Sequence, residues 1–375
     1  MLKKGFICTI VLSCLIGLIY YYDRYIDKEP TIVNDVETKI TTSAASSISQ
    51  PISITHGRGR KLQLQLYNAN KKQWETKRNY PLKNQENEKI NITYPQQWKK
   101  YNKSQWRMII NEGDTVEKYQ SPTITIHTTN RKKLPLIAKS AIIMNTKTNQ
   151  IYYQKAIHKK RSIASTTKIA TCLVALENTQ LTDKVRVTSE TVTTHLTRLR
   201  GVGDQIQMKD LLYMAMVCSD NGSATAIGQH TGGNLKNFSK MMNKRVEDIG
   251  CQNTHFTNPQ GFTAKNHYST AYDLALITKE AYQNKQLRSI VKTKSYSFNT
   301  LKKNNHYEAK TTNKLLGHIS GVTGMKTGTT YKAGKCFVCT YCHKNETYII
   351  VVLGSSEKGR WSDTKKLIKY INTYC

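Results

Sequence analysis

The order of apolar patterns after Pro135 constrains the fold of this chain more than any other feature. A hairpin pattern covers 139–155, strand patterns return over 294–300, 321–329, 335–342 and 346–354, and a last helical pattern covers 361–373. Between them, helices are expected over Thr166 to Leu176, Met208 to Val217, Asn234 to Ile249 and Thr270 to Tyr282. Strands on both sides of a helical block predict an α+β fold, in which an antiparallel sheet packs against a helical subdomain.

A different pattern precedes Pro135. Short runs in which apolar and polar residues alternate lie at 63–68, 89–94, 106–110 and 123–128. A period of two is typical of half-buried strands, so we predict a small all-β domain over 61–133 and a second domain over 136–375. We expect the tryptophans of the first domain to form its core, with a binding platform as the alternative; these are Trp74, Trp98 and Trp106.

The N-terminus has the pattern of a membrane anchor. Two lysines precede an uncharged run from Gly5 to Tyr22, and 18 residues at about 1.5 Å each span roughly the hydrocarbon thickness of a bilayer as a helix. The run ends in three tyrosines rather than in small residues. We therefore predict an uncleaved single-pass anchor over 1–22, with a signal peptide as the alternative, and a domain over 136–375 on the outer side of the cell membrane.

The segment after the anchor is rich in small hydroxyl residues. Ten of the thirty residues from Thr31 to Arg60 are Ser or Thr, and no apolar periodicity is sustained. This composition favours a linker over 23–60.

The chain carries 57 Lys and Arg against 25 Asp and Glu, a net charge of +32. Such an excess favours polyanionic surroundings. Because an exported chain rarely meets DNA, and because motifs for binding nucleic acid are missing, we expect no nucleic-acid partner. Among polyanionic partners, anionic cell-wall polymers therefore remain possible.

Three of the nine cysteines are spaced as C-x2-C-x2-C, at Cys336, Cys339 and Cys342. They lie in an apolar run that reads as a strand, where positions three apart face opposite sides. No second ligand pair follows at zinc spacing. We therefore interpret them as packed free thiols rather than as a metal site.

The first candidate catalytic motif is Ser165-Thr-Thr-Lys168. On a helix, residues i and i+3 share a face, so the lysine amine can reach the serine hydroxyl. Serine is a weak nucleophile until a base takes its proton, and a lysine whose pKa is lowered by burial can do so. The same spacing also occurs elsewhere in this chain by accident, so the motif alone is weak.

Two further motifs follow in a set order. Ser219-Asp220-Asn221 stands 54 residues after Ser165, at the end of an amphipathic helix, and Lys326-Thr327-Gly328 opens an apolar strand 107 residues after Ser219. Taken singly, the three motifs are explained by a helix cap, a helix-end turn and a solvated lysine. Taken together, their order and placement favour one catalytic site.

With these motifs the chain resembles the serine D-alanyl-D-alanine carboxypeptidases, the low-molecular-mass penicillin-binding proteins of peptidase family S11. The resemblance covers roughly 136–375 and includes IASTTKIATCLVALE at 163–177, NTHFTNPQGF at 253–262, HYSTAYDLALI at 267–277 and GMKTGTTYKAGKCFV at 324–338. The middle two segments point to the carboxypeptidases rather than to the β-lactamases. The resemblance implies a β-lactamase/transpeptidase-like fold, peptidoglycan stem peptides as substrate and β-lactams as covalent inhibitors.

The resemblance also implies a role for each motif residue. Ser165 is the expected nucleophile, Lys168 its general base and Ser219 a proton relay to the leaving amine. The residues expected to bind substrate are Asn221, Lys326, Thr327, Gly328, Thr329 and, from its place before the last helix, Arg360. Backbone N–H groups of Ser165 and Thr329 are expected to form an oxyanion hole. The mechanism needs no metal or other cofactor.

Two departures from the family pattern leave alternatives open. Asp220 stands where the family often has a small residue, and S-D-N is more typical of class A β-lactamases. However, no E-x-x-L-N segment lies between Asn221 and Lys326 to supply a deacylating glutamate. We therefore expect a stable penicillin adduct, with a β-lactamase, or a wall-binding or β-lactam-sensing protein without useful turnover, as the alternatives.

Overall fold

The computed structural model describes residues 30–36, 39–43, 48–57, 59–94, 103–113, 117–129 and 134–375. Two compact units separate, one built mainly from Pro51–Pro95 and Ser104–Thr125 and the other from Ile126–Cys375. The anchor predicted over 1–22 lies outside the described residues. Within the described ranges, no helix combines the length and apolar character needed to cross a bilayer.

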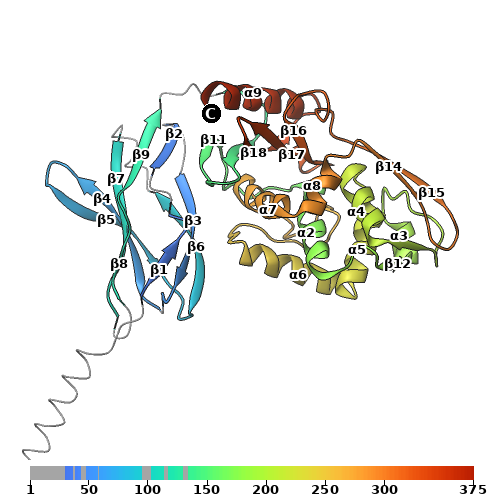
Figure 1. Ribbon diagram of the computed structural model, residues 1–375, viewed down its shortest axis with the longest axis horizontal. Coiled ribbons are helices and arrows are strands. Elements are labelled where there is room, and N and C mark those ends of the chain that lie inside the picture. The colour runs from blue at the N-terminus through green and yellow to red at the C-terminus, as the bar shows by residue number, and fades with distance from the viewer. Residues whose placement is uncertain are drawn as a thin grey trace, which may run out of the picture. The chain divides into compact units, whose positions relative to one another are not determined.

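All regular structure described before Pro135 is β (Figure 1). The strands are β1 (Ile32–Asn34), β2 (Lys39–Ser43), β3 (Ile48–Thr55), β4 (Lys61–Asn68), β5 (Gln73–Pro81), β6 (Asn87–Tyr94), β7 (Lys103–Ile110), β8 (Tyr119–Gln120) and β9 (Ile124–Thr129). The four alternating runs are confirmed as β4, β6, β7 and β9. Strand β5 was missed because its sequence, QWETKRNYP, has no apolar alternation.

The linker prediction is wrong where β1, β2 and β3 lie, because these strands fall within 23–60. Val33 of β1 pairs with Ile54 of β3 in an antiparallel ladder, and β3 also lies beside β6. Ile52 and Ile54 are each 1% exposed. Ile52 and Ile54 lie on the same face of β3. Burial of that face stabilises a strand even though the composition of the segment is typical of linkers.

The tryptophans of this region differ in burial. Trp106 is fully buried and packs edge-on against Tyr94, as expected for a core residue. Trp74 is only partly buried and contacts Tyr67 and the guanidinium of Arg107. Trp98 lies outside the described residues.

The second unit is built on a five-stranded antiparallel sheet in the order β11-β10-β18-β17-β16. Its strands are β10 (Ser140–Asn145), β11 (Ile151–Lys155), β16 (Val322–Thr330), β17 (Gly334–His343) and β18 (Glu346–Ser355). Helix α9 (Gly359–Tyr374) covers one face, and α7 (Ala271–Gln283) and α8 (Lys285–Val291) lie against the other (Figure 1). Because both faces are covered, β17 and β18 are almost continuously buried.

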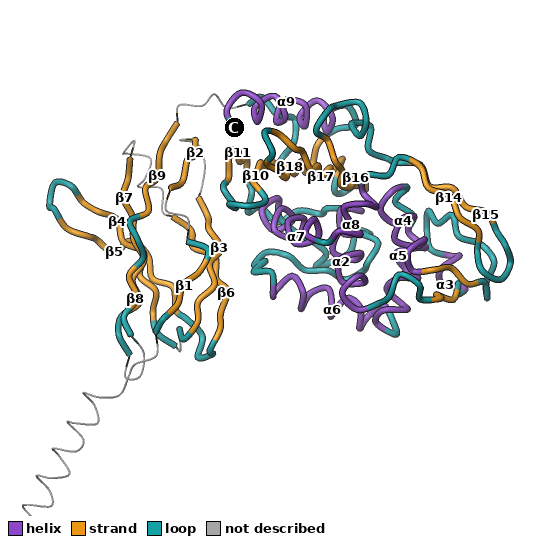
Figure 2. The backbone as a smooth tube through the Cα atoms, in the orientation of Figure 1, coloured by secondary structure: helices purple, strands orange, loops and turns teal. Residues whose placement is uncertain are grey.

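The helical block is completed by a 3-10 turn, η2 (Ala164–Thr167), and by α2 (Lys168–Asn178), α3 (Ser189–Thr193), α4 (Met208–Val217), α5 (Asn221–Gly232) and α6 (Leu235–Asp248). Two small antiparallel pairs accompany it. One pairs β12 (Lys184–Arg186) with β13 (Gln205–Gln207). The other pairs β14 (Ser295–Asn299) with β15 (His306–Lys310), which run side by side in Figure 2. The predicted helices α2, α4, α6, α7 and α9 are confirmed. Helix α5 was missed because NGSATAIGQHTG is rich in glycine and small residues that weaken a helical signal.

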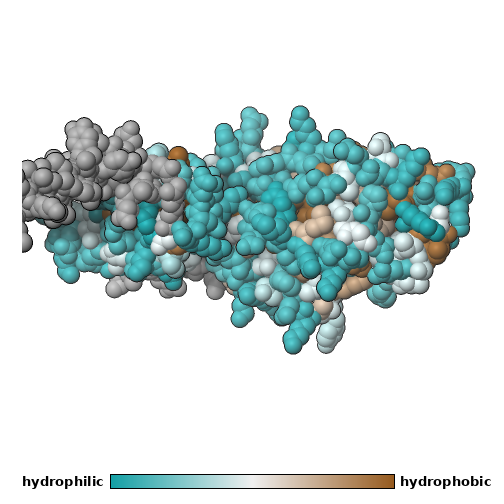
Figure 3. Space-filling model, turned by 90° about the horizontal axis from the view of Figure 1, so that it is seen from below, coloured by the Kyte–Doolittle hydropathy of each residue, from teal (hydrophilic) through white to brown (hydrophobic). Residues whose placement is uncertain are grey.

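Apolar side chains gather in two cores, one between the sheet and the helical block and one beneath α9. Cys336 belongs to the first core and Cys339 to the second, so they face opposite sides of β17, as the alternation predicted. Cys342 is exposed. The face drawn in Figure 3 is mostly hydrophilic, with apolar side chains confined to small patches.

Candidate active site

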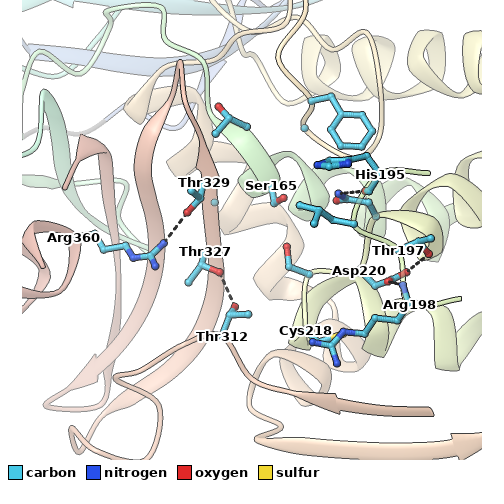
Figure 4. Close-up of a pocket in the computed structure, with 17 residues that line it drawn as sticks. Ser165, His195, Thr197, Arg198, Cys218, Asp220, Thr312, Thr327, Thr329 and Arg360 are labelled. Atoms are coloured by element: carbon cyan, nitrogen blue, oxygen red, sulfur yellow. Dashed lines mark hydrogen bonds between the residues drawn. The ribbon is translucent and has the colours of Figure 1, made fainter. Parts of the chain in front are cut away.

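A cleft of about 710 Å³ opens where β16, η2 and the start of α5 meet. Figure 4 shows Thr327, Thr329 and Arg360 on one side of Ser165, and His195 and Arg198 on the other. The cleft therefore brings together segments that are far apart in the sequence.

Ser165 and Lys168 lie on consecutive turns of backbone. Ser165 is in the 3-10 turn η2, and Lys168 is the first residue of α2. The Nζ of Lys168 donates a 3.1 Å hydrogen bond to the Ser165 Oγ. The contact predicted from the i, i+3 spacing is thus confirmed, although the α-helix begins at Lys168 rather than at Thr166.

The amine of Lys168 is fully buried and has two further acceptors. It donates to the side-chain oxygen of Asn221 at 2.7 Å and to the carbonyl oxygen of Gln260 at 2.8 Å. These bonds aim the amine at the serine hydroxyl. Burial lowers the pKa of Lys168 to about 7, while the negative charge of Asp220 opposes that shift. A substantial fraction of the amine is then neutral near pH 7 and able to take the proton of Ser165.

The loop that carries Gln260 packs closely against the backbone of Ala164. Gly261 has φ +91°, and a Cβ there would lie 2.1 Å from the carbonyl oxygen of Ala164. Asn258 closes the loop by accepting hydrogen bonds from the backbone N–H groups of Gly261 and Phe262. Sequence reasoning missed Gln260 because its contact with the lysine is made by a backbone carbonyl, which any residue type could supply.

The Ser219-Asp220-Asn221 segment forms the turn before α5. Asp220 is the N-cap of this helix, and its carboxylate accepts from the backbone N–H of Ser223 at 2.7 Å. Asn221 also donates to the carbonyl oxygen of His195 at 2.8 Å. Ser219 lines the cleft with φ 66°, and its hydroxyl makes no hydrogen bond within the described ranges. Its role as a proton relay stays a prediction.

Lys326 is on β16 but lies beneath the cleft rather than on its lining. It is 1% exposed, and its Nζ donates to the carbonyl oxygen of Thr327 at 3.0 Å. Burial, and next the charge of Lys168, lower the pKa of Lys326 well below its usual value. Lys326 makes no hydrogen bond to Ser165 within the described residues, and its role in substrate binding stays a prediction.

Strand β16 passes close to the backbone of the serine. A Cβ on Gly328 would lie 2.9 Å from the carbonyl oxygen of Ile163 and 3.1 Å from the Ser165 nitrogen. Glycine is needed here because a side chain would push the strand away. The hydroxyl of Thr327 lies 2.6 Å from that of Thr312, a cleft residue that the sequence did not single out.

Arg360 is in the first turn of α9, beside β16. It is 8% exposed and donates to the hydroxyl of Thr329 at 3.2 Å and to the carboxylate of Glu357 at 2.8 Å. Glu357 in turn pairs with Lys335 at 2.7 Å. The guanidinium predicted to assist at a carboxylate is thus held against the lining of the cleft.

These parts suit acyl transfer. The site supplies a hydroxyl beside a buried amine, a second buried lysine, threonine hydroxyls on the facing strand β16 and the guanidinium of Arg360 from α9. An amine that is neutral near pH 7 can serve as a base for the hydroxyl, and the guanidinium beside the cleft favours negative charge on a bound group.

Comparison with known proteins agrees with this chemistry. The D-alanyl-D-alanine carboxypeptidase family, peptidase S11, matches residues 127–357. The D-alanyl-D-alanine carboxypeptidase DacF of Bacillus subtilis is 32% identical over 247 residues, which are 62% of this chain and 61% of that protein. The D-alanyl-D-alanine carboxypeptidase of Streptomyces sp. strain K15 is 32% identical over 256 residues, which are 64% of this chain and 88% of that protein.

The fold agrees as well. The crystal structure of the Streptomyces K15 DD-transpeptidase superposes with a TM-score of 0.61 and 32% sequence identity, covering 64% of this chain and 98% of that one. The α+β fold predicted for 136–375 is therefore similar to that of the DD-peptidases. The family match spans more than half of the chain and includes all three motifs. This protein belongs to the peptidase S11 family of D-alanyl-D-alanine carboxypeptidases.

Proposed function

We propose that this protein is a serine D-alanyl-D-alanine carboxypeptidase that removes the terminal D-alanine from peptidoglycan stem peptides. The observation that carries the proposal is the buried Lys168 amine, with a pKa of about 7, lying 3.1 Å from the Ser165 hydroxyl. Family membership and the relatives named as carboxypeptidases support the same reaction.

Each step of the reaction has a residue in the cleft. Lys168 takes the proton of Ser165 as its oxygen attacks the carbonyl between the two D-alanines. The oxyanion is stabilised by backbone N–H groups of Ser165 and Thr329, a kind of contact worth about 3–4 kcal/mol per donor. The leaving amine receives a proton through Ser219, D-alanine departs, and water hydrolyses the acyl-enzyme. No step requires a metal.

The terminal carboxylate of the substrate has a binding site on β16. Thr327 and Thr329 present hydroxyls to the cleft, and Arg360 adds a guanidinium beside Thr329. A bound carboxylate would then receive charge-assisted hydrogen bonds. The terminal carboxylate belongs to the D-alanine that leaves. Binding this carboxylate on β16 therefore positions the neighbouring scissile bond over Ser165.

The experiment that tests the function measures D-alanine release from diacetyl-Lys-D-Ala-D-Ala by the full-length chain. Release that is lost in Ser165→Ala supports the carboxypeptidase. Labelling by fluorescent penicillin without any D-alanine release would contradict it and leave a β-lactam-sensing protein.

β-Lactams are expected to acylate Ser165 and to remain bound, because the segment between Asn221 and Lys326 has no E-x-x-L-N motif. Nitrocefin should give a single burst equal to the enzyme concentration. Steady turnover of nitrocefin would favour the β-lactamase alternative, which the S-D-N motif suggests.

We also propose that the catalytic unit works outside the cytoplasm, tethered to the cell membrane by residues 1–22. The proposal rests on the uncharged run behind two lysines. The net charge of +32 fits surroundings rich in anionic wall polymers. Protease added to intact protoplasts should digest the catalytic unit, and protection of that unit would refute this topology.

A further inference from the structure

The cleft wall opposite β16 is a short loop, 195–198, between α3 and β13. It is held against the turn that starts α5. A Cβ on Gly222 would lie 1.9 Å from the Thr197 hydroxyl and 2.7 Å from the Thr191 carbonyl oxygen, so the loop packs where only glycine leaves room. Asn221 donates to the carbonyl oxygen of His195 at 2.8 Å and ties the loop to the catalytic residues.

Asp220, the departure from the family pattern, holds the same loop. Its carboxylate accepts from the backbone N–H of Arg198 at 2.5 Å and from the Thr197 hydroxyl at 3.5 Å. The carboxylate also accepts from the N–H and hydroxyl of Ser223, at 2.7 and 2.8 Å. At 2% exposure, the Asp220 carboxylate is buried and accepts all of these hydrogen bonds.

The side chain of Arg198 reaches the cleft from this loop (Figure 4). Its guanidinium makes no hydrogen bond or ion pair with any described residue; only its backbone N–H is used. Arg360, in contrast, is already bonded to Thr329 and Glu357. The cleft thus has a restrained guanidinium on one side of Ser165 and an unpaired one on the other.

The direction in which the substrate lies in the cleft decides which of its groups Arg198 can contact. If the terminal carboxylate binds near Thr329 and Arg360, the leaving D-alanine occupies that side of Ser165. The acyl-donor arm, the part that stays on the serine, must then extend toward the opposite wall. Stem peptides carry carboxylates on this arm, on the γ-linked glutamate and in some cases on the diamino acid, and a guanidinium can bind a carboxylate in bidentate fashion.

We propose that Arg198 is a specificity-determining residue that recognises a carboxylate on the acyl-donor arm of the substrate, so that acidic arms are preferred over amidated ones. This inference rests on the proposed carboxypeptidase function.

Two matched pairs of peptides test the role. The first pair is N-acetyl-L-Glu-D-Ala-D-Ala and its L-Gln analogue. The second is an acetylated pentapeptide, L-Ala-γ-D-Glu-L-Lys-D-Ala-D-Ala, with the α-carboxylate of its glutamate free or amidated. The wild-type chain should show a kcat/KM about three- to tenfold higher for the acid than for the amide in at least one pair, as for a partly exposed charge pair.

The variants separate this role from a general effect of charge. Arg198→Gln should bring the acid-to-amide ratio close to one, and Arg198→Lys should retain part of the preference. Arg200→Gln removes a neighbouring exposed arginine that does not line the cleft, and it should keep the wild-type ratio. An unchanged ratio in Arg198→Gln, an equal loss in Arg200→Gln, or no acid preference in the wild type would overturn the proposal.

A second readout keeps this test independent of turnover. Each peptide is added as a competitor while the rate of Ser165 labelling by fluorescent penicillin is measured. Stronger competition by the acidic peptides, lost in Arg198→Gln, supports the role of Arg198 even if no D-alanine is released. If D-alanine is released but the acidic and amidated peptides compete equally, the proposed role of Arg198 is wrong while the carboxypeptidase function stands.

Discussion

The side-chain oxygen of Asn221 accepts a 2.7 Å hydrogen bond from the Lys168 amine, across 53 positions of sequence. The same asparagine donates to the carbonyl oxygen of His195. One amide therefore orients the base and fixes the facing wall of the cleft.

Replacing Asn221 by alanine should slow acylation of Ser165. The buried amine of Lys168 loses an acceptor, which costs about 1–3 kcal/mol and corresponds to roughly a 5- to 150-fold slower reaction. The measurement is the second-order rate of labelling by fluorescent penicillin. Asn237→Ala, at an exposed position of α6, is the control and should react at the wild-type rate. Wild-type labelling by Asn221→Ala would contradict the orienting role.

The rate of acylation should depend on pH through Lys168. Burial lowers the pKa of this lysine from 10.5 to about 7, so the neutral, basic form disappears as pH falls below 7. The labelling rate should fall about tenfold per pH unit well below pH 7 and level off above it. Rates measured from pH 5 to 10 test this, and a rate that keeps rising to pH 10 would show that the pKa is not lowered.

Glu357→Gln should weaken substrate binding more than it slows chemistry. Glu357 holds Arg360 at 2.8 Å and is itself paired with Lys335. Without that charge, Arg360 is less restrained, and KM for diacetyl-Lys-D-Ala-D-Ala should rise about three- to tenfold with a smaller change in kcat. Glu247→Gln, the same substitution at an exposed site on α6, serves as the control. An unchanged KM would rule out a positioning role for Glu357.

Asp204→Asn should destabilise the catalytic unit at neutral pH. Burial alone would raise the pKa of Asp204, but hydrogen bonds from Thr300 and Asn305 and from two backbone N–H groups lower it to about 2. A depressed carboxyl pKa contributes stability above its unfolded value near 4, and that stability is lost as pH falls from about 4 to 2.

The expected loss in Asp204→Asn is about 2 kcal/mol in the free energy of unfolding at pH 7, as for hydrogen bonds to a charged group. The difference from wild type should shrink as pH approaches 2. Urea unfolding followed by the helical circular-dichroism signal reports on the unit that carries Ser165, because every described helix lies in that unit. Asp248→Asn, on the surface of α6, should differ little from wild type. An equal difference at pH 7 and pH 2 would contradict this account of Asp204.

Local patterns in the sequence were sufficient to predict most elements of the second unit. Apolar periodicity predicted α4 and the strands β17 and β18, because a buried stripe or face imposes its own spacing on the residues. Periodicity failed where an element has little apolar content, as in α5. At β3 the apolar alternation is confined to Ile52 and Ile54, which is too short to outweigh the serine- and threonine-rich composition of the segment.

The sequence by itself determined the contact between Ser165 and Lys168, because the two residues are one helical turn apart and that contact follows from local geometry. Only the tertiary structure decided the rest of the site. It turned the Gln260 carbonyl toward Lys168, buried Lys326 beneath the cleft, and used Asp220 to hold Arg198 at its wall. These contacts join segments that meet only after packing, and burial then sets which charges face the substrate. No periodicity in the chain encodes them.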